Sequence, residues 1–271
     1  MNTDMKDKVA VVTGGSSGIG LAAAAAFLRD GARVAICGRS QERLDEAAAE
    51  LAAISGADNV LAVACDVLDE SDVEKLRDTV AAAFGRCDAL VCNAGQARQS
   101  NFFTTSDQDW RDEFELKFFS VLRPVRAFAG LLEASGAGAI VVTSAILARQ
   151  PEPFLIATGA TRAGQLNLMK SLSLEFAPKN IRANAVLIGL VDSGQWGRRY
   201  ERGEYPDGRK IPAGMSKEDY FADLAKSRHI PLGRLGTPAE AANAILFFAS
   251  SASSYITGET IDVTGGQARN V

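Results

Sequence analysis

A glycine-rich turn near the start of the chain carries the clearest chemical signal in the sequence. It lies between an apolar run and a helical pattern and reads Thr13, Gly14, Gly15, Ser16, Ser17, Gly18, Ile19, Gly20. Glycine permits positive φ in a tight turn and lets the backbone approach a pyrophosphate closely. The helix that follows would offer free N–H groups and the positive end of its dipole to the anion. Glycines also build ordinary tight turns, but the strand–turn–helix context favours a pyrophosphate site with contacts from Gly14, Ser16, Ser17, Gly18, Ile19 and Gly20.

Polar and small residues also follow two later apolar runs. Asp66 and Val67 come after the third run, where a carboxylate can accept a hydrogen bond from an adenine amino group. Asn93, Ala94 and Gly95 come after the fourth run and would bring a glycine close to a ribose. Together with the turn, these residues indicate a dinucleotide site at one edge of a sheet.

The elements that must position these residues are short apolar runs alternating with longer helical patterns. The runs are 9–12, 34–37, 60–63, 89–92, 140–142, 183–187 and 260–263, and the helical patterns are 18–30, 41–54, 71–84, 110–134, 158–176 and 239–249. Continuous apolar strands are typical of a parallel sheet covered on both faces. We therefore expect an α/β fold, a doubly wound, Rossmann-like, seven-stranded parallel sheet forming a single domain over residues 1–271.

One segment, residues 194–230, breaks this alternation. It is rich in charge, glycine and tyrosine, and it lies between the sixth strand and the last helix. That position is beyond the carboxyl ends of the strands, where such sheets bind ligands. We expect a mobile lid over a substrate cleft; an oligomer contact or a plain surface loop is the alternative.

Composition excludes several classes of function. The net charge of −4 gives no basic surface for nucleic acid, and no apolar run approaches the roughly 18 residues of a membrane span. The first eight residues are polar and lack the order of a signal peptide. We expect a cytoplasmic protein with no membrane partner. Cys37, Cys65, Cys87 and Cys92 are expected to be free thiols, and neither they nor His229 form a metal-ligand pattern.

The glycine-rich turn and the strand ends resemble those of the short-chain dehydrogenase/reductase family. The family's turn matches Thr13, Gly14, Gly18 and Gly20, its Asn-Asn-Ala-Gly motif matches 92–95, and its signature after the sixth strand matches Ile188, Gly189, Val191 and Ser193. The resemblance covers essentially the whole chain and implies a nicotinamide cofactor and an oxidoreductase. It also implies cofactor contacts from Thr143, Arg162, Gly189, Val191 and Ser193.

The end of the second strand indicates which nicotinamide cofactor is bound. NAD sites place an acid there, whereas NADP sites use a basic residue for the 2′-phosphate. Gly38 stands at the acid's position and Arg39 follows it, with Ser40 able to add a hydroxyl contact. We expect NADP (NADPH) to be favoured over NAD; the alternative is that Arg39 is a solvated residue at the start of a helix.

The family's usual catalytic residues are replaced in this chain. The resemblance puts Thr158 at the position of the tyrosine, Arg162 at that of the lysine and Lys117 at that of the asparagine. Ala145 stands at the serine position, beside Ser144, and no tyrosine occurs before Tyr200. A threonine hydroxyl is far less acidic than a phenol, and arginine stays protonated, so the usual proton transfer is lost while ribose binding can persist.

Two hypotheses follow from these replacements. In the first, the protein is an atypical NADP-dependent oxidoreductase acting on a carbonyl, hydroxyl or imine, with Lys117 as proton donor because the cationic Arg162 would lower its pKa. Against this, Lys117 could be solvated or paired with an acid such as Glu115. Tyrosines of the lid, Tyr200, Tyr205 or Tyr220, could instead supply the proton. In the second hypothesis the protein binds NADP(H) without catalysis, as a sensor or scaffold.

The partners expected are a small-molecule substrate and further copies of the chain. Residues that could line the substrate pocket are Arg149, Glu152, Gln195, Trp196, Arg198 and Arg199. The basic pair Arg198 and Arg199 could suit an acidic substrate, or it could simply be solvated. Helices 110–134 and 158–176 are apolar on more than one face, and in the family they form a dimer contact, which implies a homodimer or homotetramer.

Overall fold

The computed structural model describes residues 3–206 and 208–269 and contains one parallel sheet. Its strands are β1 (Val9–Thr13), β2 (Arg33–Gly38), β3 (Val60–Ala64), β4 (Ala89–Cys92), β5 (Ala139–Ala145), β6 (Arg182–Ile188) and β7 (Thr260–Val263). They are ordered β3-β2-β1-β4-β5-β6-β7, so the strand order reverses between β1 and β4. In such sheets ligands bind beyond the carboxyl ends of the strands at this reversal.

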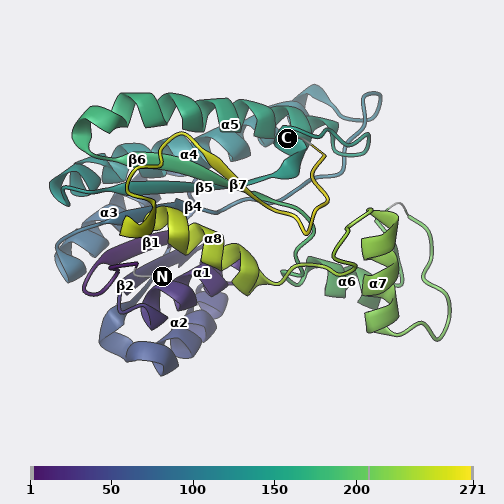
Figure 1. Ribbon diagram of the computed structural model, residues 1–271, viewed down its shortest axis with the longest axis horizontal. Helices are drawn as coiled ribbons and strands as arrows, with labels where there is room; N and C mark the ends of the chain where they lie inside the picture. The colour runs from purple at the N-terminus through teal and green to yellow at the C-terminus, as the bar shows by residue number, and fades with distance from the viewer. Residues whose placement is uncertain (1–2, 207, 270–271) are drawn as a thin grey trace.

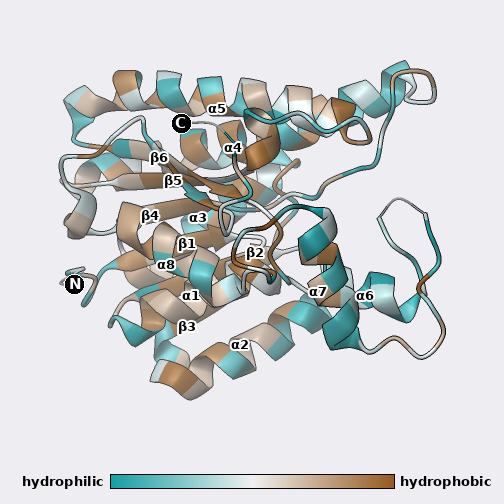
Figure 2. Ribbon diagram, turned by 45° about the vertical axis from the view of Figure 1, so that its right-hand side comes forward, coloured by the Kyte–Doolittle hydropathy of each residue, from teal (hydrophilic) through white to brown (hydrophobic). Residues whose placement is uncertain are grey.

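Helices cover both faces of the sheet (Figure 1). One layer contains α1 (Gly18–Arg29), α2 (Gln41–Ser55) and α8 (Pro238–Ala249), and the other contains α3 (Glu70–Phe84), α4 (Asp107–Ala134) and α5 (Ile156–Phe176). Short 3-10 helices occupy Ala57–Asn59, Ile146–Ala148, Ala177–Lys179 and Ser251–Ser253. Each layer packs its apolar side against the sheet and forms a separate hydrophobic core (Figure 2).

The predicted fold class is confirmed, and the differences lie at helix starts. All seven predicted runs are strands. The central strands are apolar because they are buried on both faces of the sheet, whereas the edge strands β3 and β7 are largely half-buried. Helix α4 begins at Asp107 rather than at residue 110. The Ser106 side chain accepts from the Asp109 N–H while the Asp109 carboxylate accepts from the Ser106 N–H, a capping box built from polar residues that carry no apolar period.

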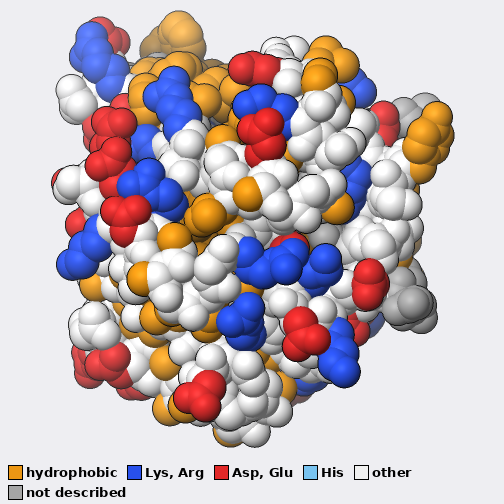
Figure 3. All heavy atoms as spheres, turned by 90° about the vertical axis from the view of Figure 1, so that its left-hand side faces the viewer, with side chains coloured by type: hydrophobic (Ala, Val, Ile, Leu, Met, Phe, Trp, Pro, Cys, Tyr) orange, Lys and Arg blue, Asp and Glu red, His pale blue; other side chains and the backbone are white. Residues whose placement is uncertain are grey.

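The lid segment (residues 194–230) contains two helices that its sequence pattern did not reveal, α6 (Gln195–Glu201) and α7 (Lys217–Ser227). They stand beside the carboxyl ends of the strands, apart from the two helical layers (Figure 1). They pack around a small core of their own that includes Tyr205, Tyr220 and Leu224. Figure 3 shows the face at the other end of the molecule, where acidic and basic side chains are interspersed.

Candidate functional site

The glycine-rich turn is held in place by β4. The Asn93 side-chain amide donates to the carbonyl oxygens of Thr13 and Gly14 at 3.1 and 3.2 Å, and the Thr13 hydroxyl accepts from the N–H groups of Asn93 and Ala94. Gly14 has φ +66°, and a Cβ atom at Gly20 would lie 2.3 Å from the Gly14 oxygen. Glycine is therefore required at both positions. The predicted residue Asn93 acts here by fixing the turn.

The turn lies next to the loop that follows β6. A Cβ atom at Gly18, which has φ +58°, would lie 3.1 Å from the Ser193 Cβ. Gly189 lies against the C-terminal segment, where its Cβ would be 2.9 Å from Gln267 Oε1. Val191 is buried and forms a bridge with Gly236. The predicted residues of the turn and of the β6 loop are thus brought together over the reversal point of the sheet.

The residues predicted for the adenosine end lie at the ends of β2 and β3. The Arg39 side chain is exposed and makes no ion pair with any residue that the structure describes. A Cβ atom at Gly38 would lie 3.2 Å from Ser16 Oγ, so Ser16 lies over the residue preceding Arg39. Ser40 caps α2 by accepting from the Arg43 N–H.

The remaining predicted cofactor residues differ in exposure. Asp66 Oδ1 accepts from the Leu68 N–H at 3.0 Å, which orients the carboxylate in its own turn. Val67 is buried in the core, Ile19 is half-buried, and Ser17 and Gly95 are exposed. A Cβ atom at Gly95 would lie 3.6 Å from Arg162 Nη2, which connects the β4 loop to α5.

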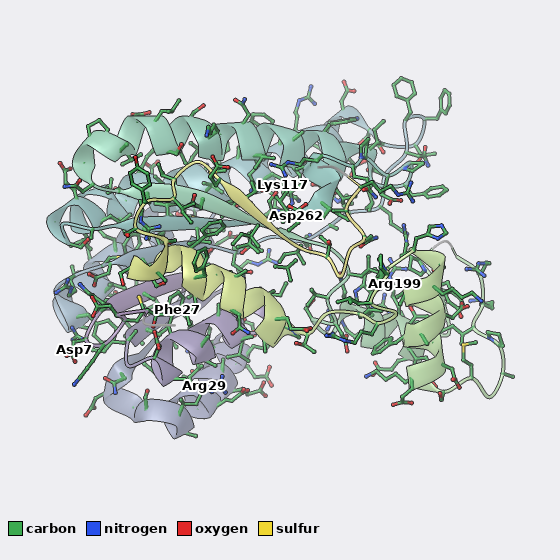
Figure 4. The ribbon with its side chains drawn as sticks, in the orientation of Figure 1. Asp7, Phe27, Arg29, Lys117, Arg199 and Asp262 are labelled. Carbon is green, nitrogen blue, oxygen red and sulfur yellow. The ribbon has the colours of Figure 1, made fainter. Side chains whose placement is uncertain are left out.

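A buried ion pair occupies the centre of the candidate catalytic site. The Lys117 ammonium (Figure 4) donates to Glu113 Oε2 and to the Gln96 carbonyl oxygen, both at 2.7 Å. The side chains of Lys117 and Glu113 are only 1% and 2% exposed. The hydroxyl of Thr158 donates to Glu113 Oε1 at 3.3 Å, so Glu113 joins two of the predicted residues.

Arg162, the third predicted catalytic residue, lies beside this pair. Its Nη1 donates to the Thr143 carbonyl oxygen at 2.7 Å and to Gln165 Oε1 at 2.9 Å, and the Gln165 amide donates to the Lys117 carbonyl oxygen. Arg162 Nε, Thr143 Oγ1 and Ser144 Oγ are buried without a hydrogen-bond partner among the described residues. Buried polar groups of this kind are normally satisfied, so these atoms are available to a ligand.

Burial shapes the electrostatics of this cluster. Desolvation lowers the pKa of Lys117, the positive charge of Arg162 lowers it further, and Glu113 opposes both. Burial also lowers the pKa of Arg162 to about 10, which still leaves the guanidinium charged near neutral pH. The acid paired with Lys117 is Glu113 and not Glu115, which pairs with Arg123 at 2.9 Å. The i, i+4 spacing of Glu113 and Lys117 was the available signal for this pair.

The lid tyrosines lie in the core of the lid segment. Tyr200 Oη donates to the Met215 carbonyl oxygen at 2.7 Å, and Tyr205 Oη contacts the Met215 sulfur at 3.4 Å. Tyr220 is fully buried between the other two rings. Desolvation, with a hydrogen bond to Asp223 as a further cause, raises the pKa of Tyr205 to about 12. These contacts place the three rings together in the core of the lid segment.

A polar cleft of about 520 Å³ lies between the loop after β4 and helix α6. It is lined by Gln96, Ala97, Gln99, Gln195, Arg198, Arg199, Arg202 and Glu204. Three of the predicted pocket residues lie elsewhere: Arg149 faces Asp262 at 3.8 Å, Glu152 accepts from Arg228, and Trp196 packs in the lid core. The charged residues that follow β5 thus form ion pairs outside this cleft.

The helices α4 and α5 share an apolar groove of about 720 Å³ on the outside of the molecule. Phe114, 49% exposed, stacks on Phe118 with ring centroids 4.2 Å apart. A Cβ atom at Gly164 would lie 2.7 Å from the Phe118 ring, so the two helices approach closely there. Val121, Met169 and Leu172 face the inner core instead.

Within the described ranges, no cluster of His, Cys, Asp and Glu side chains could hold a metal ion, and the four cysteines are buried free thiols. None of the helices of this part of the chain combines the length and apolar character needed to span a bilayer.

Comparison with known proteins places these features in context. A family model described as enoyl-(acyl carrier protein) reductase matches residues 14–268. A 3-oxoacyl-[acyl-carrier-protein] reductase of Chlamydia muridarum is 33% identical over 268 residues, which cover 99% of this chain and 100% of that protein.

Solved structures of oxidoreductases are also similar to this chain over nearly its whole length. A short-chain oxidoreductase of Pseudomonas aeruginosa, described as containing an atypical catalytic center, is 48% identical in its apo form, with a TM-score of 0.92 and coverage of 99% of this chain and 100% of that one. Its NADPH-bound structure has a TM-score of 0.89 and covers 97% and 98%. The L-sorbose reductase of Gluconobacter frateurii, in complex with NADPH and L-sorbose, is 31% identical with a TM-score of 0.91 over the full length of both chains.

Proposed function

This chain belongs to the short-chain dehydrogenase/reductase family of NAD(P)-dependent oxidoreductases, and from that premise we propose that it uses NADP(H) and that Lys117 is its proton donor. The substrate class is a carbonyl compound or imine, or the corresponding alcohol or amine. The observation that carries the proposal is the buried contact of Lys117 with Glu113, which reaches the Thr158 hydroxyl where the family has a tyrosine.

The residues at the strand ends fit a nicotinamide dinucleotide. A Cβ atom at Gly14 or Gly20 would collide with the turn itself or with the loop after β4, so these glycines allow the tight turn that a pyrophosphate site requires. The buried unpartnered atoms of Arg162 and Thr143 can supply polar contacts to the cofactor. When bound, the cofactor supplies or accepts a hydride. The exposed guanidinium of Arg39 supports NADP(H), because its planar fork suits a 2′-phosphate. Two of the relatives described above bind NADPH, in agreement with this assignment.

The side chains of the cluster support distinct roles. Lys117 holds the proton on Nζ, and its lowered pKa brings that proton closer to release near neutral pH. Glu113 keeps the ammonium in position and balances its charge. Arg162 stays charged near neutral pH, so it can hold the cofactor's ribose and bias the pKa of Lys117 but does not itself exchange the proton. Thr158 donates to Glu113 and orients that carboxylate.

The test is to replace Lys117 by Met and to measure both turnover with a panel of carbonyl compounds and the binding of NADPH by fluorescence. We expect turnover to be abolished while NADPH binds with unchanged affinity. Lys75→Met, at an exposed position on α3, is the matched control. Full activity of the Lys117→Met variant would overturn the assignment of the proton donor.

The burial of Lys117 favours a second candidate function, the binding of NADP(H) without catalysis. With 1% of its side chain exposed, Lys117 can serve solely to hold the loop after β4 through the Gln96 carbonyl. In that case the protein would bind NADPH but turn over no member of the panel. The lid segment would then report to a partner whether the cofactor is bound. Its proteolysis pattern should change when NADPH is added.

We also propose that the apolar groove on α4 and α5 joins two copies of the chain into a homodimer or homotetramer. Phe114 is half exposed there and contributes to a largely apolar surface. Phe114→Asp should lower the mass measured by light scattering. An unchanged mass would place the contact elsewhere.

A further inference from the structure

Helix α6 presents one polar face to the cleft. Gln195, Arg198, Arg199 and Arg202 line the cleft, and their spacing of i, i+3, i+4 and i+7 is that of one helical face. The opposite face anchors the helix: the Trp196 indole N–H donates to the Val191 carbonyl oxygen at 3.1 Å, and Tyr200 donates to Met215. The three guanidinium groups are therefore carried by a helix whose other side is fixed.

The described residues that line the cleft include three arginines and one glutamate, so the charge of this lining is positive. Arg198, Arg199 and Arg202 form no ion pair with any other residue of 3–206 and 208–269. Glu204 is paired with Lys210 at 2.7 Å; this hydrogen bond, and less strongly the charges of Arg199 and Arg202, lower its pKa. Around this group the cleft offers the side-chain amides of Gln96, Gln99 and Gln195, which add hydrogen-bond donors.

A single residue, Gln96, connects the cleft with the buried ion pair. Gln96 lines the cleft, and its carbonyl oxygen accepts from Lys117 Nζ at 2.7 Å. Figure 4 shows Lys117 in the body of the molecule and Arg199 in the lid segment. Gln96 thus connects the cleft that contains the arginines with Lys117.

We propose that this cleft binds the anionic end of the substrate, a carboxylate or a phosphate, and that the reacting carbonyl of the same molecule faces Lys117. The orientation of the carbonyl rests on the proposed function, whereas binding of the anion does not. Arginine is suited to this task because its planar fork donates two parallel hydrogen bonds to a carboxylate or phosphate. The substrate class is thus a small oxo acid or a phosphorylated carbonyl compound.

The experiment is calorimetric titration of the full-length protein, with and without saturating NADP⁺, using two matched pairs of probes. Levulinate and methyl levulinate differ in a carboxylate, and dihydroxyacetone phosphate and dihydroxyacetone differ in a phosphate. We expect one anion to bind at least about tenfold more tightly than its neutral partner, as one or two charge-assisted hydrogen bonds would give. The pair that discriminates identifies the carboxylate or the phosphate.

Two variants attribute the binding to α6. Arg199→Gln should lower the affinity for the anion about tenfold and leave the affinities for the neutral probe and for NADP⁺ unchanged. Arg29→Gln, on α1 and far from Arg199 (Figure 4), should leave the binding of the anion, the neutral probe and NADP⁺ unchanged. Equal binding of anion and neutral probe, no binding of either anion at millimolar concentration, or equal effects of the two variants would each overturn the proposal. Failure of NADP⁺ to bind would instead count against the proposed function, since the anion is also titrated without it.

Discussion

Removing both partners of the Glu113–Lys117 pair should destabilise the protein by less than the sum of the two single losses. With Nζ and Oε2 2.7 Å apart, the gross attraction is about 6 kcal/mol at an effective dielectric constant of about 20. Lys117→Met leaves the Glu113 carboxylate buried beside Thr158, and Glu113→Gln leaves the ammonium buried near the cationic Arg162 without its counter-charge. Breaking a buried pair in this way costs about 3–5 kcal/mol, which corresponds to a fall in Tm of roughly 6–20 °C.

The double variant Glu113→Gln/Lys117→Met contains no buried charge at this position, so its loss should be smaller than the sum of the single losses by about 2–3 kcal/mol. The measurement is urea unfolding of all four proteins followed by circular dichroism. The Glu115–Arg123 pair, partly exposed, is the matched control, and its cycle should couple by less than about 1 kcal/mol. Additive losses for Glu113 and Lys117 would refute the view that the two charges depend on each other.

Three further predictions concern the cofactor site and helix α8. Arg39→Gln should lower the affinity for NADPH about 10- to 100-fold in a fluorescence titration and leave the affinity for NADH unchanged. Equal losses of affinity for the two cofactors would show that Arg39 does not bind the 2′-phosphate. Gly20→Ala should cost about 1–3 kcal/mol in urea unfolding and weaken NADPH, because its Cβ would meet backbone 2.3 Å away. Gly130→Ala, with open space around its Cβ, should instead stabilise by about 0.5–1 kcal/mol. The hydrogen bond from Arg234, together with the backbone N–H of Thr237, lowers the pKa of Glu240 to about 2 from the usual 4.5. The stability that the ionised Glu240 adds to the folded protein is therefore fully present above pH 4.5 and is lost as the pH falls toward 2. Glu240→Gln should therefore be less stable by about 0.5–1 kcal/mol at neutral pH and equal to the parent near pH 2 by thermal unfolding; a gap that widened in acid would contradict this sign.

The sheet could be predicted from the sequence because its signal is local. A strand buried on both faces is mostly apolar, as at 9–12, and a turn whose own backbone atoms lie this close together must use glycine, as at Gly20. The alignment of Thr158 and Arg162 with the usual catalytic positions stays a prediction, made from the register along one helix. These features depend on neighbours in the chain, which the sequence shows directly.

The contacts between elements could not be predicted in the same way. The sequence left Lys117 as a proton donor, a solvated lysine or the partner of an acid such as Glu115, because both Glu113 and Glu115 lie on the same helix. Which of the two turns inward depends on the packing of α4 against α5, where the Thr158 hydroxyl reaches the Glu113 carboxylate. The lid helices were missed for a similar reason: α6 has only seven residues and owes its position to the packing of its aromatic side chains in the lid core.

The replacements around the site are coupled through Glu113. A lysine ammonium that is 1% exposed needs a nearby carboxylate, and that carboxylate needs a donor for its second oxygen, which the Thr158 hydroxyl supplies. Thr158 is itself 1% exposed, so a tyrosine ring there would have to displace the residues that surround the ion pair. The three side chains therefore form one arrangement, and restoring the tyrosine alone would not restore the usual site. Under the function proposed above, this mutual dependence means that the three side chains would hold the proton as a unit.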